Sequence, residues 1–264
     1  MKILLLGCGN LGKALLEAWV NNGVQAQIMV VQPSLSAQPL FDAYPSVTFC
    51  AHVQDIPPEF TPDIIVIAVK PQRLPTLLPS CVPYCQKALV VSLAAGVSVS
   101  RLTVSLKGYC QIVRIMPNVA VKIGESVNLA YSNLDLSFDQ QKQLDAVFGI
   151  TGKMVWLEKE ELIDILTPIS GSGPAYFFLL AETLTQITIT LGLKEDLARE
   201  LVQQTFLGSA LLTARNPSFE QMMASVASKG GVTEAALQVL RPGLPGLLSK
   251  ALEAAATKVK ELNG

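Results

Sequence analysis

The sequence contains a single histidine, His52, in 264 residues. A metal site built from several histidines is therefore excluded. His52 lies between a short strand-like run and a proline-rich loop, so we expect it to be structural or solvated rather than the base of a catalytic triad. The chemistry of this protein must depend little on side-chain acids and bases other than hydroxyls, carboxylates or a lysine.

Charge is also scarce, because charged residues make up only 16% of the chain and the net charge is −1. The absence of a basic run leaves no electrostatic footprint for nucleic acid. Half of the residues are apolar, and we expect the surplus to form a subunit interface. The longest uncharged apolar stretch, 165–181, is interrupted by prolines and glycines. It is also shorter than the roughly 20 residues that a membrane span needs, so no membrane association is expected.

The five cysteines, Cys8, Cys50, Cys81, Cys85 and Cys110, do not form a metal-binding pattern. Cys81 and Cys85 are four residues apart, but no second pair or nearby histidine completes a site. The chain opens on a strand-like run rather than a charged segment followed by an apolar signal sequence. We therefore expect reduced thiols, no metal and a cytoplasmic protein.

The most informative stretch that is present is the first one. Four aliphatic residues, 3–6, lead directly into a Gly-x-Gly-x-x-Gly sequence, where a helical pattern begins. This context is typical of the dinucleotide-binding fingerprint, although a glycine turn without a ligand would look similar. Gly7 would permit the sharp turn, Gly9 would admit the pyrophosphate, and Gly12 would allow the helix to pack closely on the strand. The predicted cofactor contacts here are Gly7, Gly9, Asn10, Leu11 and Gly12.

The end of the second strand-like run, 27–31, bears on the choice of nicotinamide cofactor. An acid at about position 32 would bond the ribose hydroxyls and favour NAD, but the chain has Gln32-Pro-Ser34. No lysine or arginine occurs from Val24 to Ala68, so a 2′-phosphate would be held by Ser34, Ser36 and backbone N–H groups. The missing acid favours NADP(H) over NAD(H), with Gln32 and Ser34 among its contacts.

Further strand-like runs at 47–50, 63–69, 88–93, 109–115, 126–131 and 154–157 alternate with candidate helices at about 72–80, 98–106 and 138–148. This alternation predicts a Rossmann-type α/β domain with a mostly parallel, doubly wound sheet. Ligands bind at the carboxyl ends of such strands. The segments expected to converge there with the glycine loop contain Ala68, Val69, Lys70, Pro71, Ala94, Ala95, Gly96, Met116, Pro117 and Asn118.

The character of the chain changes at about Glu158. Helical patterns follow at about 159–167, 172–192, 194–214, 218–225, 232–240 and 244–262. We therefore predict a nucleotide-binding domain over 1–158 and an all-helical domain over 159–264. The helix at 172–192 is apolar nearly all round, so it should be buried between neighbouring helices or between subunits.

A second candidate anion site lies in the helical half, where Gly230-Gly231-Val232-Thr233 precedes a helical run. Free N–H groups at a helix start, together with a hydroxyl, could bind a carboxylate. The same turn could also merely cap a helix, with Thr233 as the N-cap. Hydride transfer to a protonated C=N bond would suit a protein so poor in acid–base groups, because the cofactor supplies the hydride.

These motifs together resemble pyrroline-5-carboxylate reductase over essentially the whole chain. Besides the glycine loop and the Gly230–Thr233 turn, the likeness rests on Ala68-Val-Lys-Pro-Gln72, Ser92-Leu-Ala-Ala-Gly96, Arg114-Ile-Met-Pro-Asn118, Gly171-Ser-Gly-Pro-Ala-Tyr176 and Gln204-Thr-x-x-Gly208. The resemblance implies NAD(P)H-dependent reduction of 1-pyrroline-5-carboxylate to L-proline, the last step of proline biosynthesis. It also implies a homo-oligomer, a dimer or a ring of dimers, whose helical domains interlock.

The resemblance further implies how the residues divide their roles. Ala68, Lys70 and Pro71 would line the cofactor, and Met116–Asn118 would lie near the nicotinamide. The substrate would be held by Ser228, Gly230, Gly231, Val232 and Thr233, with Thr233 as the catalytic residue near the ring nitrogen. The chain departs from the family pattern at Lys229, where proline is usual, and at Val232, where threonine is frequent.

Two alternatives remain open. A related NADP-dependent imine or β-hydroxyacid reductase would share the two-domain plan, but the latter needs a catalytic lysine and residues 160–193 contain none. A regulatory protein that senses NADP(H) without turnover belongs to a different class. Such a sensor would not need the second anion site at Gly230–Thr233.

Overall fold

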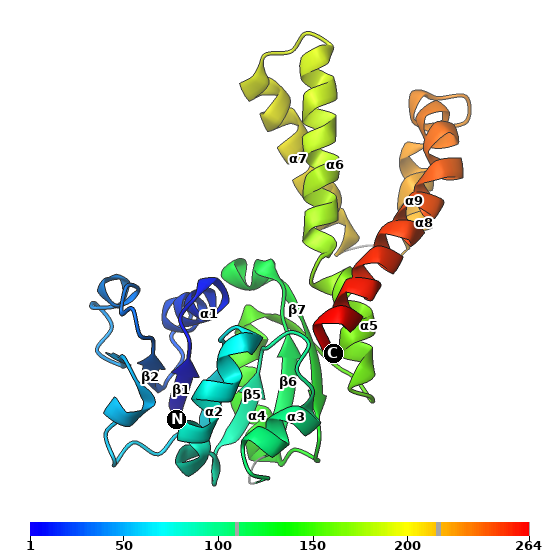
Figure 1. Ribbon diagram of the computed structural model, residues 1–264. Helices are drawn as coiled ribbons and strands as arrows, with labels where there is room; N and C mark the ends of the chain where they lie inside the picture. Colours follow the sequence, from blue (N-terminus) through cyan, green and yellow to red (C-terminus); the bar gives the residue numbers. More distant parts are fainter. Residues whose placement is uncertain (109–110, 215–217, 264) are drawn as a thin grey trace. The chain divides into compact units, whose positions relative to one another are not determined.

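The computed structural model describes residues 1–108, 111–214 and 218–263 (Figure 1). The first two residues of the strand predicted at 109–115 lie outside this set. Contacts divide the chain into two compact units, one formed by 1–172 with 256–264 and the other by 173–255. Among the described residues, none of the helices combines the length and apolar character needed to cross a membrane.

The first unit is built on one eight-stranded sheet with the order β3-β2-β1-β4-β5-β6-β7-β8. Neighbouring strands are parallel except for β6 and β7, which are antiparallel. This confirms the predicted Rossmann-type, mostly parallel sheet. The strands are β1 (Lys2–Leu6), β2 (Gln27–Val31), β3 (Val47–Cys50), β4 (Ile64–Ile67), β5 (Leu89–Ser92), β6 (Ile112–Met116), β7 (Ser126–Ser132) and β8 (Gly152–Trp156).

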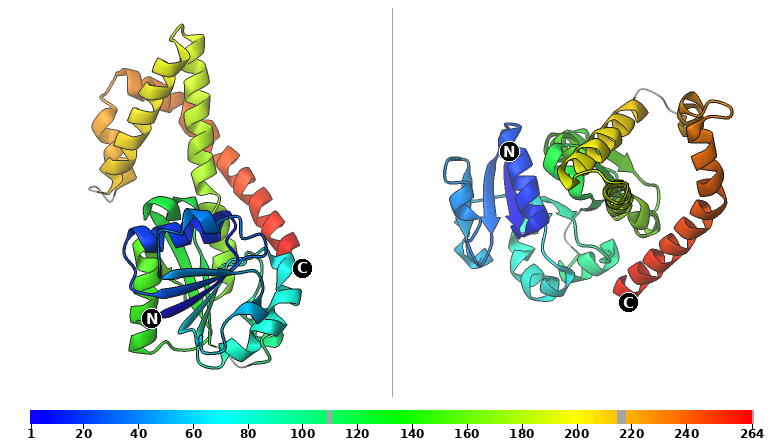
Figure 2. Two further views of the ribbon diagram at one scale, coloured as in Figure 1. Left: turned by 90° about the vertical axis from the view of Figure 1, so that its left-hand side faces the viewer. Right: turned by 90° about the horizontal axis from the view of Figure 1, so that it is seen from above.

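Both faces of the sheet are covered by helices, as the continuous aliphatic runs of its central strands require. Alternate residues of β1 show the division, since Ile3 and Leu5 belong to one apolar core and Leu4 and Leu6 to the other. The first core includes side chains of α1 (Asn10–Asn21) and α4 (Phe138–Phe148). The second includes side chains of α2 (Leu74–Cys85) and α3 (Val99–Ser105). Figure 2 shows helices on both sides of the sheet, which therefore lies between the two apolar cores.

Short elements complete the first unit. The last long helix before the second unit is α5 (Glu161–Ser170). Helix α5 belongs to the same compact unit as the sheet. The chain therefore changes from strands to helices before it enters the second unit. The domain boundary near 158 stays a prediction. The 3-10 helices are η1 (Gln38–Leu40), η2 (Val53–Asp55), η3 (Pro71–Arg73), η4 (Val119–Ile123) and η5 (Gly149–Thr151).

The second unit is helical, as predicted. It contains α6 (Gly173–Thr190), α7 (Glu195–Thr213), α8 (Phe219–Val226) and most of α9 (Val232–Asn263). Helices α6 and α7 pack side by side (Figure 1), and the ring centroids of Phe177 and Phe206 are 6.1 Å apart.

The prediction of two separate helices at 232–240 and 244–262 is wrong, because α9 is continuous through Pro242 and Pro245. Each proline removes one intrahelical donor, yet its fixed φ is compatible with a helix. A proline in a helix interior usually kinks or breaks the helix. Here the helix continues on both sides of the two prolines.

Candidate cofactor and substrate sites

A crevice of about 650 Å³ opens at the carboxyl ends of β1, β2, β3 and β4. We call it the β1–β4 crevice. It lies where the strand order reverses between β1 and β4, the usual ligand position in an open parallel sheet. Its walls come from the segments that follow these strands: Gly7 and Gly9 after β1, Gln32 and Ser34 after β2, His52 and Gln54 after β3, and Ala68–Lys70 after β4.

The three glycines of the opening loop have different surroundings. Gly7 has φ = 98°, and a Cβ there would lie 2.6 Å from Cγ1 of Val69. A Cβ on Gly12 would collide with the carbonyl oxygen of Gly7. A Cβ on Gly9 would meet no atom within 4 Å. Gly7 and Gly12 are therefore required by the close approach of α1 and β4 to the loop, whereas the space beside Gly9 is open.

Helix α1 begins directly after Gly9, which caps it without a side-chain hydrogen bond. The first-turn N–H groups of a helix have no intrahelical acceptor, and they carry the positive end of the macrodipole. The first turn of α1 contains no acidic residue that would neutralise this end. The N-terminus of α1 can therefore bind a phosphate group.

Gln32 connects the end of β2 to the glycine loop. Its side-chain Oε1 accepts a hydrogen bond of 2.8 Å from the backbone N–H of Cys8, and its Nε2 donates to Oγ of Ser34 at 3.0 Å. The hydroxyl of Ser34 lies 2.9 Å from that of Ser36. The position that often carries a carboxylate in NAD-binding proteins is thus occupied by a neutral amide that is already engaged. Burial raises the pKa of the Cys8 thiol to about 11, so the thiol is uncharged at neutral pH.

Several crevice residues were missed by the sequence analysis. Arg73, Thr76, Leu77 and Ser80 line one wall, at spacings that put them on one side of η3 and α2. The sequence argument considered lysines and arginines only as far as Ala68. On the helix expected at 72–80, the spacing of Arg73, Thr76 and Ser80 places them on one side, and this pattern could have indicated Arg73 as a crevice residue. The described lining residues include Lys70 and Arg73 but no carboxylate.

His52 also lines the crevice. Its backbone N–H donates to Oδ2 of Asp55 at 2.9 Å, which fixes the start of η2. This bond does not involve the imidazole, so the structural or solvated role expected for the side chain stays a prediction. The position of the residue in the crevice was not foreseen, because it depends on where β3 ends.

Not every predicted cofactor contact lines the β1–β4 crevice. Asn10, Leu11, Gly12 and Pro71 lie in the same loops but outside its wall. The remaining residues lie at or just after the carboxyl ends of the next two strands along the sheet, β5 and β6, which are at the same edge as the carboxyl end of β4. They are Ala94, Ala95, Gly96, Met116, Pro117 and Asn118.

The turn at 228–231 has a tight, specific geometry within the second unit. Gly230 has φ = 72°, and its N–H donates to Oε2 of Glu234 at 2.6 Å. A Cβ on Gly231 would lie 2.5 Å from Oγ of Ser228. Helix α9 starts at Val232, whose side chain is 91% exposed. Thr233 is therefore the second residue of the helix, and the alternative that it serves as the N-cap is wrong.

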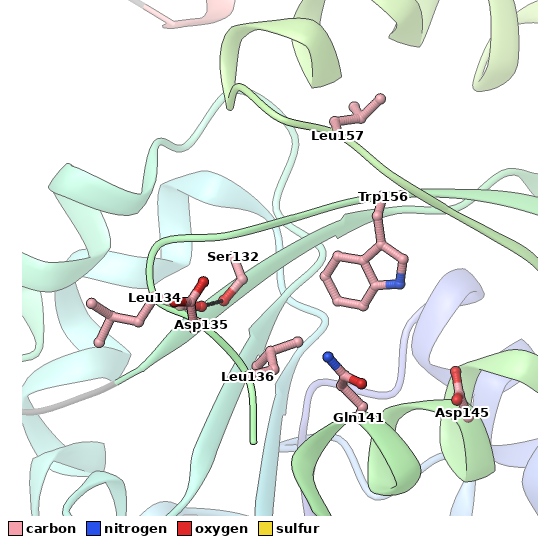
Figure 3. A pocket seen from close by; sticks show the side chains of 8 residues that line it. All are labelled: Ser132, Leu134, Asp135, Leu136, Gln141, Asp145, Trp156 and Leu157. Carbon is pink, nitrogen blue, oxygen red and sulfur yellow. Dashed lines mark hydrogen bonds between the residues drawn. The ribbon is translucent and has the colours of Figure 1, made fainter. Parts of the chain in front are cut away.

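A second hollow, of about 370 Å³, lies beside β7, β8 and α4 (Figure 3). The indole of Trp156 faces Gln141 across it. It contains none of the predicted cofactor or substrate residues, and β8 is the far edge strand of the sheet. The β1–β4 crevice is therefore the better candidate for a cofactor site.

Comparison with known proteins gives two family matches. Residues 160–262 match the model described as pyrroline-5-carboxylate reductase dimerisation. Residues 2–96 match the model described as NADP oxidoreductase coenzyme F420-dependent. The pyrroline-5-carboxylate reductase of Pasteurella multocida is 33% identical, over 98% of this chain and 97% of the relative. That of Haemophilus influenzae is 31% identical, over 90% of this chain and 88% of the relative.

Solved structures agree with these matches. A pyrroline-5-carboxylate reductase from Coxiella burnetii has a TM-score of 0.90 at 31% identity, covering 99% of this chain and 98% of that one. The NADP-bound pyrroline carboxylate reductase of Plasmodium falciparum has a TM-score of 0.85 at 27% identity, covering 100% of this chain and 98% of that one. An imine reductase from Streptomyces aurantiacus, at 11% identity and a TM-score of 0.61 over 99% and 94% of the two chains, shares only the fold. The chain belongs to the pyrroline-5-carboxylate reductase family.

Proposed function

We propose that this chain reduces 1-pyrroline-5-carboxylate to L-proline and that it prefers NADPH as the hydride donor. The observation that carries the activity is family membership over nearly the whole length of the chain. The cofactor would occupy the β1–β4 crevice. The substrate carboxylate would bind at the turn that precedes α9.

The residues of the crevice fit a dinucleotide. The open space beside Gly9 and the uncapped N-terminus of α1 would receive the pyrophosphate. The adenine ribose would lie beside Gln32 and Ser34. The nicotinamide would lie toward Ala94–Gly96 and Met116–Asn118, and when bound it supplies the hydride for the reaction.

The preference for NADPH rests on the charge of the crevice. A 2′-phosphate is doubly charged or nearly so, and a carboxylate at position 32 would repel it. Gln32 is neutral, Ser34 and Ser36 offer hydroxyls, and Lys70 and Arg73 provide two positive charges in the same crevice. Arginine can hold a phosphate through two parallel hydrogen bonds, so we assign the 2′-phosphate to Arg73 and the two serines.

The substrate site needs few acid–base groups. Because the N–H of Gly230 already donates to Glu234, the carboxylate would be held by the N–H groups of the first turn of α9 and by the hydroxyl of Ser228. The hydroxyl of Thr233 would orient the ring nitrogen. A protonated imine is already electrophilic and already carries the proton that proline retains on nitrogen. This explains how a chain with one histidine can perform the reduction.

The decisive experiment measures NADPH oxidation by the purified protein with 1-pyrroline-5-carboxylate, with NADH in parallel. We expect turnover with both cofactors and a higher kcat/KM with NADPH. Turnover of another cyclic imine but not of this substrate would favour the imine reductase alternative. Tight NADPH binding with no turnover of any imine would favour the sensor. A higher kcat/KM with NADH would contradict the proposed cofactor preference alone.

A further inference from the structure

The guanidinium of Arg114 is a buried charge on β6, and Arg114 is not among the residues that line the β1–β4 crevice. Arg114 lies on β6 with only 3% of its side chain exposed. Its Nη1 donates to Oε1 of Glu160 at 2.7 Å, and its Nη2 donates to Oδ1 of Asp164 at 3.0 Å. Both carboxylates belong to the start of α5, so one arginine attaches this end of the helix to β6.

Glu160 has a second partner. The same Oε1 accepts a hydrogen bond of 2.7 Å from the backbone N–H of Val99, the first residue of α3. Val99 directly follows the loop that contains Ala94–Gly96. One carboxylate oxygen thus connects β6, the start of α5 and the end of the loop after β5.

The opposite end of α5 is held by Asn118. Its Nδ2 donates to the carbonyl oxygen of Ser170 at 3.0 Å, and its Oδ1 accepts from the N–H of Ala120 at 3.0 Å. Its backbone N–H donates to Oγ of Ser126 at 2.9 Å. The side-chain amide is therefore engaged within the protein on both its oxygen and its nitrogen, and it fixes the turn after β6.

We infer that Arg114, Glu160 and Asn118 are positioning residues for hydride transfer. We call these three residues with α5 the α5 brace. The brace holds the two loops assigned to the nicotinamide, Ala94–Gly96 and Met116–Asn118, against one helix. This inference rests on the proposed function. It adds a positioning role for the amide of Asn118, whose predicted contact with the cofactor stays a prediction.

The physical reason is the sensitivity of hydride transfer to distance and direction. A displacement of about 1 Å at the reacting centre can cost a hundredfold in rate. Both segments are short connections: Ala94–Gly96 lies between β5 and α3, and Met116–Asn118 runs from the last residue of β6 to the residue before η4. A buried charge pair with additional hydrogen bonds has one favourable geometry, whereas an apolar contact tolerates several. The brace would thus fix the loops more precisely than packing alone.

The test compares three variants with the wild-type protein. Asn118→Asp keeps the acceptor for Ala120 but loses the donor to Ser170. Glu160→Gln keeps the size and one acceptor but removes the charge. Glu17→Gln is the matched control, since it disrupts an exposed pair with Lys13 at 3.6 Å in the same unit. Asn118→Asp leaves the buried charge of Arg114 paired, so it remains informative if Glu160→Gln does not fold.

Two readouts separate positioning from general damage. We expect kcat to fall about tenfold or more in Asn118→Asp and Glu160→Gln, because the reacting geometry is loosened. The dissociation constant of adenosine 2′,5′-bisphosphate, which occupies only the adenosine side of the crevice, should stay within about twofold of wild type, since no brace residue contacts it. The fluorescence of bound NADPH should shift in both variants, because it reports the surroundings of the nicotinamide. The control should match wild type in all three measurements.

The inference is overturned if both variants keep wild-type kcat and wild-type fluorescence of bound NADPH. It is also overturned if adenosine 2′,5′-bisphosphate binding is lost in step with kcat, because that would indicate a general loss of structure. The fluorescence measurement needs no imine substrate. An absence of turnover in the wild-type protein would therefore count against the proposed function and leave the brace testable by fluorescence.

Discussion

The two units of this chain differ in how far they bury their apolar side chains. In the first unit, the sheet and its helices bury residues such as Leu5 and Trp19 completely. In the second unit, the apolar side chains that the described structure buries are Ala198 and Val202. On α6, by contrast, Leu180 and Leu184 are 56% and 46% exposed.

The difference indicates which unit needs a partner. The first unit forms two cores from its own sequence. The second unit presents an apolar stripe on α6, at the helical spacing of Leu180, Leu184 and Ile187. This surface lies in the segment that matches a dimerisation family. Cofactor binding should therefore depend on the first unit alone, and activity should depend on association through the second.

The largest expected effect is on cofactor binding. Gly9→Val should abolish NADPH binding, because the side chain would fill the open space through which the pyrophosphate approaches the loop. Isothermal titration calorimetry would measure this directly. The oligomeric state should remain that of wild type, which serves as the internal control. If Gly9→Val bound NADPH as tightly as the wild-type protein, the assignment of the glycine loop to the pyrophosphate would be wrong.

The next effect should be on assembly. Leu184→Lys puts a charge into the apolar stripe of α6, and burying an unpaired charge at an interface is costly. We expect dissociation to monomers in analytical ultracentrifugation and loss of turnover, with NADPH binding retained. Leu184→Met, which conserves volume and polarity, should behave like wild type. An intact oligomer in the lysine variant would exclude this stripe from the interface.

A smaller effect is expected at the substrate turn. Thr233→Ala should lower kcat about tenfold or more, because a hydroxyl that orients the ring nitrogen is lost. NADPH affinity should not change, since Thr233 belongs to the other unit. Thr188→Ala, which removes a hydroxyl bonded only to its own helix, is the matched control. Equal losses of kcat and NADPH affinity would place Thr233 outside the substrate site.

Cofactor preference should respond more modestly. Arg73→Gln removes one of the two cations of the β1–β4 crevice, so the KM for NADPH should rise about tenfold while that for NADH stays constant. Steady-state kinetics with both cofactors would measure the change. The same substitution at the exposed Arg101 on α3 is the control. An equal rise in KM for NADPH and NADH would show that Arg73 does not bind the 2′-phosphate.

The smallest effect is a loss of stability at high pH, and it should originate in the first unit. Burial raises the pKa of Cys8 and Cys50 to about 11, and that of Cys81 to about 12, from 9.0. The unfolded chain therefore releases these protons first as the pH rises. The stability that the buried thiols contribute is complete below about pH 9 and falls as the pH rises through their folded pKa values.

Thermal unfolding between about pH 8 and pH 10 would reveal this decline. Cys81→Ala should show a shallower dependence of Tm on pH than wild type, because the substitution removes a thiol whose pKa is raised in the folded state. An unchanged slope would mean that the thiols do not control the alkaline transition.

Much of this architecture could be predicted from the sequence, for reasons that are local. The aliphatic runs of β1, β2, β4 and β5 are continuous because both faces are buried, and that pattern needs no tertiary information. The spacing of Gly7, Gly9 and Gly12 likewise predicts a sharp turn between a strand and a helix from local sequence alone. The turn before α9 was found because Gly230 and Gly231 precede a helical run.

The features that were missed depend on tertiary placement. Arg73 follows β4 by several residues, and only the fold brings it into the same crevice as Ser34. The hydrogen bond from the Asn118 amide to the carbonyl oxygen of Ser170, which is far away in the sequence, was not predicted. No sequence pattern predicts a hydrogen bond between residues so far apart in the chain. The continuity of α9 through Pro242 and Pro245 was not predicted, and prolines usually interrupt a helix.

The route of the chain between its two units has a practical consequence for anyone who wishes to divide the protein. The chain leaves the first unit after Ser172 and returns to it at Ala256. In terms of connectivity the helical unit is therefore an insertion with two attachment points, not a tail. Truncation after α5 would deprive the nucleotide-binding unit of its own last segment. An isolated version should instead join 1–172 to 256–264 through a short flexible linker.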